Sequence, residues 1–226
     1  MQFNLAQREL TLKVVYYGAA LSGKTTNLQA VHQMVPSEGA GRLMTLETRD
    51  DRTLFFDLLP IFFRTRSGYK VKLRLFTVPG QTLHDSTRKV VLQGADAVVF
   101  VADSQVSASE LNKESFRNLR DNLSANGLDV DTIPLVIQFN KRDLPNVRSD
   151  DELRALEERR RTPVYRAVAV QGQGVLETLR GLLGLTWDSL EASYEIGVKL
   201  QTDRDTFMEQ VFQGWDAGRL RGGLYP

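Results

Sequence analysis

Short hydrophobic runs alternate with segments of helical periodicity along most of the chain. The runs cover residues 10–17, 43–46, 54–63, 71–76, 97–102, 135–139 and 165–170. Several are continuously apolar, which is typical of strands buried on both faces of a mainly parallel sheet. Between two of them, Phe116, Leu119 and Leu123 recur at the spacing of a helix with one buried face. The alternation of strand and helix predicts a three-layer α/β domain.

The helical pattern continues beyond the last of these runs. Apolar side chains recur at helical spacing at Leu176, Leu179, Leu183, Trp187, Leu190 and Tyr194, and again at Met208, Val211, Phe212 and Trp215. We therefore expect a domain over residues 1–185 and a helical C-terminal extension over 186–226. We favour two extra helices that fold back on the domain. The alternatives are a docking helix with Trp187 or Trp215 as anchor, and a helix on a membrane surface, which the interspersed acidic residues disfavour.

Composition places the chain among soluble globular proteins. Of 226 residues, 42% are hydrophobic, and 29 Lys and Arg stand against 28 Asp and Glu, without the basic excess typical of nucleic-acid binders. There is no cysteine, which excludes disulfides, thiolate metal sites and cysteine-linked lipids. We see no secretory signal, and no apolar run approaches the roughly 20 residues of a membrane span. We expect a cytoplasmic protein without an integral membrane segment.

Residues 18–25, Gly-Ala-Ala-Leu-Ser-Gly-Lys-Thr, match the phosphate-loop pattern in full. A strand-like run precedes them and a helical pattern follows, as this motif requires. Small residues allow consecutive backbone N–H groups to surround nucleotide phosphates, while Lys24 reaches the β- and γ-phosphate oxygens and the Thr25 hydroxyl binds Mg²⁺. The candidate phosphate-binding residues are Gly18, Ala20, Leu21, Ser22, Gly23, Lys24, Thr25 and Thr26. The alternative is a glycine-rich turn with an incidental lysine.

A second motif selects the base. Asn-Lys-Arg-Asp at 140–143 directly follows the apolar run 135–139. The Asp143 carboxylate can accept a pair of hydrogen bonds from N1–H and the exocyclic amine of guanine, a pair that adenine lacks. Asn140 would brace the loop, and the stem of Lys141 would lie along the base plane. Taken alone, the Asn-Lys-Arg-Asp motif is also typical of a polar turn after a strand. Together with a phosphate loop it predicts guanine-nucleotide binding and disfavours a kinase or an ATPase.

These motifs carry a family resemblance. The matching segments are 13–18, 23–29, 51–57, 77–81, 100–105 and 140–146. On them the chain resembles the MglA family of bacterial Ras-like small GTPases, which control cell polarity and gliding motility. The similarity covers about residues 8–185. It implies a P-loop NTPase of the Ras-like α/β/α type that binds GTP and GDP with Mg²⁺ and hydrolyses GTP.

The resemblance also implies roles in catalysis. Gln81 would orient the attacking water, and Gly80 would give its N–H to the γ-phosphate. Thr53 would close on Mg²⁺ and the γ-phosphate, and Arg52 would neutralise transition-state charge once a partner positions it. The alternatives are an exposed glutamine after a Pro-Gly turn, and an arginine paired with a neighbouring aspartate. Near the last strand, Ala169 beside Val168 would present its N–H to the guanine oxygen.

One position departs from the wider Ras-like pattern. Most Ras-like proteins have an aspartate four residues before the catalytic glutamine, where it helps to hold the water shell of Mg²⁺. Thr77 stands there in this chain, a departure that the MglA group shares. A hydroxyl supplies no charge, so Asp57 is a possible replacement. Otherwise Asp57 is a solvated or ion-paired strand residue.

The expected partners are implied by the family resemblance alone. It implies a GTPase-activating dimer of roadblock fold, similar to MglB, and effectors that bind the GTP state. It also implies recruitment to cell poles or to the inner membrane surface through such partners. A scaffold that binds GTP with negligible turnover is the other functional class, and the presence of both Arg52 and Gln81 argues against it.

Overall fold

The computed structural model describes the chain except for residues 48–54, 81–84, 217 and 219–226. The described residues form one mixed sheet in the order β3-β4-β5-β2-β6-β7-β8, with β1 antiparallel to β2. The strands are β1 (Gln2–Asn4), β2 (Glu9–Tyr17), β3 (Met44–Glu47), β4 (Phe55–Arg64), β5 (Lys70–Thr77), β6 (Ala97–Asp103), β7 (Leu135–Asn140) and β8 (Val164–Arg166). Strands β5, β2, β6, β7 and β8 run parallel, whereas β3 and β4 are antiparallel to their neighbours.

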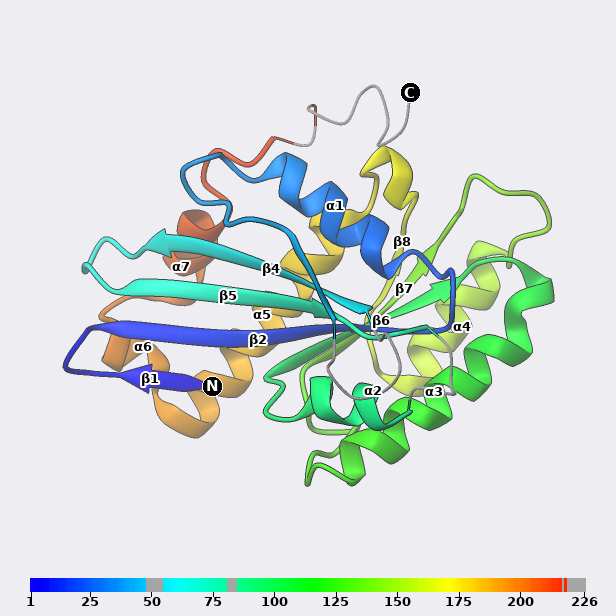
Figure 1. The fold of residues 1–226 in the computed structure, drawn as a ribbon, viewed down its shortest axis with the longest axis horizontal. Helices are drawn as coiled ribbons and strands as arrows, with labels where there is room; N and C mark the ends of the chain where they lie inside the picture. Colours follow the sequence, from blue (N-terminus) through cyan, green and yellow to red (C-terminus); the bar gives the residue numbers. More distant parts are fainter. Residues whose placement is uncertain (48–54, 81–84, 217, 219–226) are drawn as a thin grey trace.

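Helices cover both faces of the sheet (Figure 1). They are α1 (Lys24–Met34), α2 (Asp85–Leu92), α3 (Ser109–Ser124), α4 (Asp150–Arg160), α5 (Val175–Tyr194), α6 (Ile196–Leu200) and α7 (Arg204–Val211), with short 3₁₀ turns η2 (Val106–Ala108) and η3 (Ala169–Gln171). One hydrophobic cluster joins the sheet to α1, α5, α6 and α7, and a second joins its other face to α2, α3 and α4. The predicted three-layer α/β fold is confirmed.

The strand expected over 165–170 is shorter than predicted. β8 ends at Arg166, and the η3 turn begins at Ala169. The chain leaves the sheet because the Ala169 N–H donates to Asn140 Oδ1 (2.9 Å) and the Val168 N–H donates to Gln173 O (3.0 Å). The end of this run therefore forms a loop at the carboxyl edge of the sheet.

The described part of the extension over 186–226 folds back on the domain, as predicted. Helix α5 is continuous from Val175 to Tyr194, so the boundary expected at residue 185 falls inside it. The Phe207 ring of α7 packs against Trp187 (centroids 4.8 Å apart) and against Phe63 of β4 (5.5 Å). Trp187 is only 5% exposed, because it lies in the same core as α1 and the sheet.

Candidate functional site

The predicted phosphate loop lies at the carboxyl edge of the sheet, between the end of β2 and the start of α1. Two of its glycines have backbone conformations that disfavour other residues, with φ of 152° at Gly18 and 100° at Gly23. A Cβ atom on Gly18 would lie 2.2 Å from the Val101 carbonyl oxygen, and one on Gly23 would lie 2.1 Å from Asn140 Nδ2. The loop therefore packs against β6 and β7 in a form that only glycine permits.

Lys24 points its ammonium group back into this loop. Its Nζ donates to the carbonyl oxygens of Gly18 (3.0 Å) and Ala19 (2.6 Å), and the residue is 6% exposed. The pKa of Lys24 is lowered to about 7, mainly by burial and in addition by the Arg88 charge, while the Asp57 carboxylate opposes both effects. Among the described residues the buried Ser22 hydroxyl has no hydrogen-bond partner. A buried cation, an unused hydroxyl donor and the positive end of α1 together suit a phosphate group.

Asp57 of β4 lies directly beside the predicted metal ligand Thr25. The Thr25 hydroxyl donates to Asp57 Oδ2 (2.6 Å), and the Thr77 hydroxyl of β5 donates to the same oxygen (3.0 Å). The Thr45 hydroxyl of β3 donates to the other carboxylate oxygen (3.0 Å). Asp57 is 7% exposed. The fold thus brings one buried carboxylate to Thr25 and Thr77, at the position where the sequence lacks the usual aspartate.

This donor set fits Mg²⁺ held jointly by protein and nucleotide. A hydroxyl and a carboxylate are the hard oxygen ligands that Mg²⁺ prefers, and the ion usually completes its shell with phosphates and water. Among the described residues there is no group of three or more His, Asp or Glu side chains that holds a metal by itself.

Asn140, the last residue of β7, connects the two predicted nucleotide motifs. Its Nδ2 donates to the carbonyl oxygen of Ser22 in the phosphate loop (2.9 Å), while its Oδ1 accepts from the Ala169 N–H. Lys141 forms an ion pair with Asp103 of β6 (2.7 Å). Asp143 is exposed on the same loop. The Ala169 N–H, which is predicted to face guanine, thus donates to Asn140 Oδ1, and the Val168 side chain is buried.

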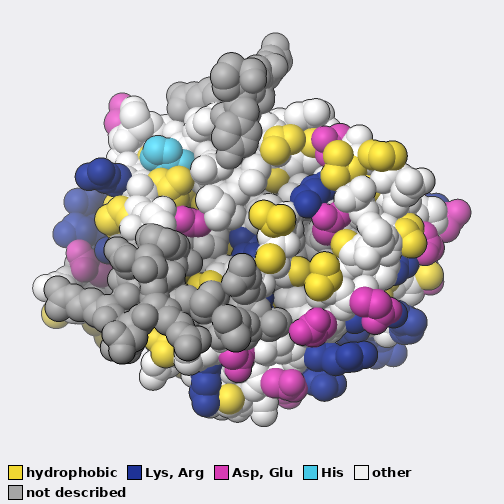
Figure 2. Space-filling view, turned by 45° about the vertical axis from the view of Figure 1, so that its right-hand side comes forward, with side chains coloured by type: hydrophobic (Ala, Val, Ile, Leu, Met, Phe, Trp, Pro, Cys, Tyr) yellow, Lys and Arg dark blue, Asp and Glu magenta, His cyan; other side chains and the backbone are white. Residues whose placement is uncertain are grey.

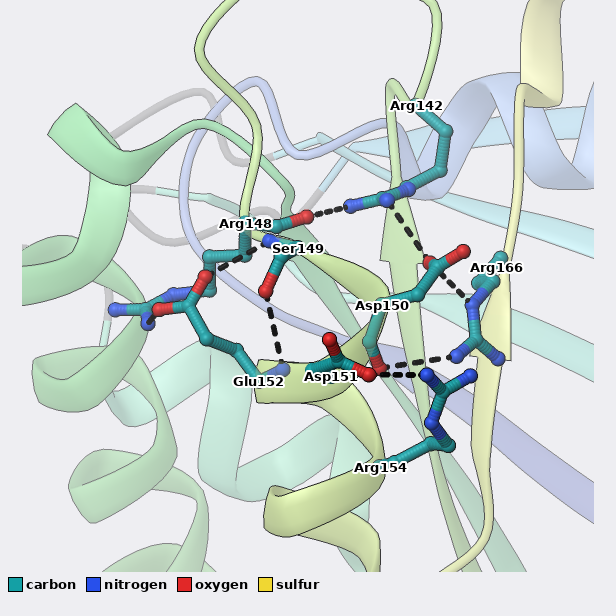
Figure 3. Close-up of polar contacts among 8 residues, drawn as sticks. All are labelled: Arg142, Arg148, Ser149, Asp150, Asp151, Glu152, Arg154 and Arg166. Atoms are coloured by element: carbon teal, nitrogen blue, oxygen red, sulfur yellow. Dashed lines mark hydrogen bonds and ion pairs between the residues drawn. The ribbon is translucent and has the colours of Figure 1, made fainter.

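A polar network behind these loops was not predicted (Figure 3). Asp150, the first residue of α4, forms ion pairs with Arg142 of the base motif (3.0 Å) and with Arg166 at the end of β8 (2.6 Å). The hydrogen bond from Arg166 holds the pKa of Asp150 below its usual value. Ser149 and Glu152 form a capping box that fixes the start of α4. The run Ser-Asp-Asp-Glu at 149–152 was the available sequence signal, because it marks a helix N-terminus.

Comparison with known proteins identifies the family. A family model described as the ADP-ribosylation factor family matches residues 61–185. The chain is 48% identical over 188 residues to the mutual gliding-motility protein MglA of Myxococcus xanthus (strain DK1622), which covers 83% of this chain and 96% of that protein. The chain belongs to the MglA-like small GTPases. The resemblance, the Ras-like fold and the assignment as a GTP hydrolase are thereby confirmed.

Three predicted site residues of this GTPase lie outside the described residues: Arg52 and Thr53 within 48–54, and Gln81 within 81–84. Gly80, at the border of the second segment, is described. A Cβ atom on Gly80 would lie 2.4 Å from Ala20 Cα, so its backbone lies directly against the phosphate loop. The two elements that would enclose a γ-phosphate are therefore already adjacent.

The rim of this GTPase site is partly apolar. Leu21 is 87% exposed on the phosphate loop, Leu144 follows the base motif at 36%, and Val170 lies in η3 at 38%. Figure 2 is turned toward this side of the molecule and shows hydrophobic side chains gathered near the centre of the view, with acidic and basic ones toward its lower right. An apolar rim next to Asp143 suits a purine, whose faces are apolar and whose edge is polar.

A hollow of about 430 Å³ lies elsewhere in this GTPase, over the amino ends of β2 and β5. Its lining includes Glu9, Phe62, Arg64, Lys70 and Lys72. It lies at the opposite end of these strands from the phosphate loop.

None of the described helices is long and apolar enough to cross a membrane.

Proposed function

We propose that this GTPase is a molecular switch that regulates cell polarity or motility by binding its partners in the GTP state. The observation that carries the proposal is the position of Asn140, which contacts the phosphate loop through Ser22 and the turn after β8 through Ala169. One side chain thus couples the residues for the phosphates to those for the base. The likeness to MglA, whose name records a role in gliding motility, supports the cellular assignment.

In the proposed binding mode, the loop from Gly18 to Thr26 surrounds the phosphates and Lys24 neutralises their charge. Asp143 accepts the paired hydrogen bonds of guanine, with Lys141 along the base plane and Val168 and Ala169 at its far edge. Thr25 and Thr53 hold Mg²⁺, and Asp57 replaces the missing aspartate of the wider Ras-like pattern. When bound, Mg²⁺ neutralises charge on the β- and γ-phosphate oxygens. The contact of Asp57 with Thr25 and Thr77 supports its assignment.

For hydrolysis we propose that Gln81 orients the water, Gly80 donates its N–H to the γ-phosphate, and Arg52 neutralises transition-state charge. Hydrolysis is slow until an MglB-like dimer of roadblock fold positions Arg52, an effect that arginine fingers supply at about 10³- to 10⁵-fold. GTP-state effectors bind the surface formed by Thr53 and Gly80. Such partners recruit the protein to cell poles or to the inner membrane surface. Residues 186–226 are proposed as an addition to a domain of residues 1–185.

The base assignment is tested by Asp143→Asn. An amide cannot accept both guanine hydrogen bonds, so we expect GDP affinity to fall by about 100-fold or more, since each bond to a charged group contributes roughly 1.5–3 kcal/mol. The matched control is Asp151→Asn, which removes an exposed charge from α4 without touching either nucleotide motif. Equilibrium binding of fluorescent GDP measures both. Unchanged GDP affinity, or adenine nucleotide in the purified protein, would refute the assignment.

Measured GTP turnover distinguishes the proposed switch from a scaffold that binds GTP with negligible hydrolysis. Single-turnover release of phosphate is measured for the wild type and for Arg52→Ala, each alone and with the activating dimer. We expect stimulation in the wild type and its loss in Arg52→Ala. Absence of phosphate release under every condition favours the scaffold, and equal stimulation of both proteins contradicts the role of Arg52.

A further inference from the structure

Arg88 of α2 is a fully buried cation that the proposed mechanism does not use. It is 0% exposed and is the largest of the fully buried side chains. Its Nε donates to the Pro79 carbonyl oxygen (2.8 Å), and its Nη2 donates to the carbonyl oxygens of Gly80 (2.8 Å) and Gly18 (3.2 Å). Its Nη1 donates to Asn118 of α3 (2.5 Å). One guanidinium thus joins the residues before Gln81 to the phosphate loop and to α3.

Burial of the Arg88 guanidinium away from water costs free energy of solvation. A buried charge needs compensation, and Arg88 forms no ion pair within the described part of the chain. Its charge is instead met by backbone carbonyl oxygens and by the ring of Tyr17, whose centroid is 4.9 Å away. Asp85 forms no ion pair with Arg88, but the Arg88 charge helps to lower its pKa, and its carboxylate accepts hydrogen bonds from Asn118 Nδ2 (2.6 Å) and Asn122 Nδ2 (2.7 Å). The acceptors around Arg88 require several N–H donors held in one plane, which a guanidinium provides and a lysine ammonium group does not.

The contacts determine how the Gly80 N–H is oriented. The Pro79 carbonyl and the Gly80 N–H belong to one planar peptide group and point in opposite directions. Because Arg88 holds that carbonyl and also the next one, at Gly80, the peptide cannot rotate without losing hydrogen bonds to a charged donor. The same guanidinium also holds Gly18, against whose loop Gly80 packs. The peptide group is therefore fixed in orientation and in distance from the phosphate loop.

We propose that Arg88 is a positioning residue that orients the Pro79–Gly80 peptide for the γ-phosphate and thereby sets the preference of the site for GTP over GDP. This rests on the proposed contact of the Gly80 N–H with the γ-phosphate. Arg88 itself touches no nucleotide atom in this scheme. GDP lacks the phosphate that this peptide would contact, so its affinity depends little on Arg88.

The test compares GTP and GDP affinities in Arg88→Lys, which keeps the charge but cannot bridge the four acceptors. We expect affinity for a GTP analogue with an imido β–γ bridge to fall about tenfold, the equivalent of one lost charge-assisted hydrogen bond, while GDP affinity stays within about twofold. The control is Lys89→Met, which removes the neighbouring exposed cation of α2. Asn118→Ala removes the Nη1 acceptor and leaves the three backbone acceptors of Arg88, and it also removes the contacts of Asn118 with Tyr17 and Asp85. It is expected to shift the ratio in the same direction by a smaller factor.

The outcomes separate the two proposals. Equal loss of both affinities in Arg88→Lys, or an unchanged ratio, overturns the inference because it leaves Arg88 a structural role only. Should Arg88→Lys fail to fold, Asn118→Ala decides by the same criterion. A wild-type protein that binds neither guanine nucleotide overturns the proposed function itself.

Discussion

Nucleotide binding by this GTPase should consume a proton above neutral pH, and Lys24 is the reason. Its ammonium group is buried against the carbonyl oxygens of Gly18 and Ala19, and its pKa is lowered to about 7 from the ordinary 10.5, mainly by this burial. Phosphate oxygens placed beside Nζ favour the charged form and raise this pKa again. At a pH between the pKa of Lys24 before binding and its higher pKa in the nucleotide complex, binding therefore requires that Lys24 take up a proton.

The magnitude follows from the pKa of the free protein. At pH 8 a group with a pKa of about 7 is ~90% deprotonated, so binding takes up about 0.9 proton per nucleotide, whereas at pH 6 the uptake is about 0.1. The association constant then falls by about tenfold for each pH unit above 7. The sign is opposite for stability: the unfolded chain keeps this proton up to pH 10.5, so the contribution of Lys24 to the free energy of unfolding rises with pH between about 7 and 10.5.

The assay is titration calorimetry of GDP with nucleotide-free protein at pH 8, in buffers that differ in ionisation enthalpy. At this pH the GDP phosphates are fully ionised, since phosphate groups titrate near pH 6, so the proton count reports the protein. The matched control is Lys24→Arg, whose guanidinium is charged at every pH used, and for which we expect uptake near zero. Uptake near zero in the wild type would refute the reasoning.

Two further predictions concern the metal and the C-terminal helices. Asp57→Asn removes the charge beside Thr25 with little change in shape, so we expect the Mg²⁺ concentration that retains GDP to rise about tenfold, or roughly 1.4 kcal/mol. A Mg²⁺ titration of GDP release measures this, with Asp151→Asn on α4 as the control. An unchanged midpoint contradicts the assignment of Asp57. Phe207→Ala leaves a cavity between Trp187 and β4 and should lower the free energy of unfolding by about 3–5 kcal/mol in urea, with GDP affinity unchanged. A smaller loss than about 1 kcal/mol would show that α7 contributes little to the core.

Much of the fold was predictable because its signals are local. Continuous apolar runs predicted β6 and β7, and periodic side chains predicted α3 and α5. The strand that the run 165–170 predicts ends at Arg166 instead, because the N–H groups of Ala169 and Val168 bond outside the sheet, to a side chain and to a loop carbonyl. Apolar character alone does not distinguish a buried strand from a buried loop. The apolar side chains from Leu176 to Tyr194 keep helical spacing across residue 185, and α5 runs through that position from Val175 to Tyr194.

The sequence by itself determined the phosphate loop and the base motif. Their chemistry depends on the spacing of residues within one short segment, and the glycines at 18 and 23 can be read directly from the sequence. Only the tertiary structure placed Asp57 beside Thr25. That contact depends on the register of antiparallel strands, which aligns Thr45 with Asp57 and Leu58 with Phe76. A slip of one residue would move the carboxylate to the other face of the sheet. The contacts of Arg88 with Gly18 and Asn118 are equally non-local, because they require α2, the phosphate loop and α3 to meet in the folded core.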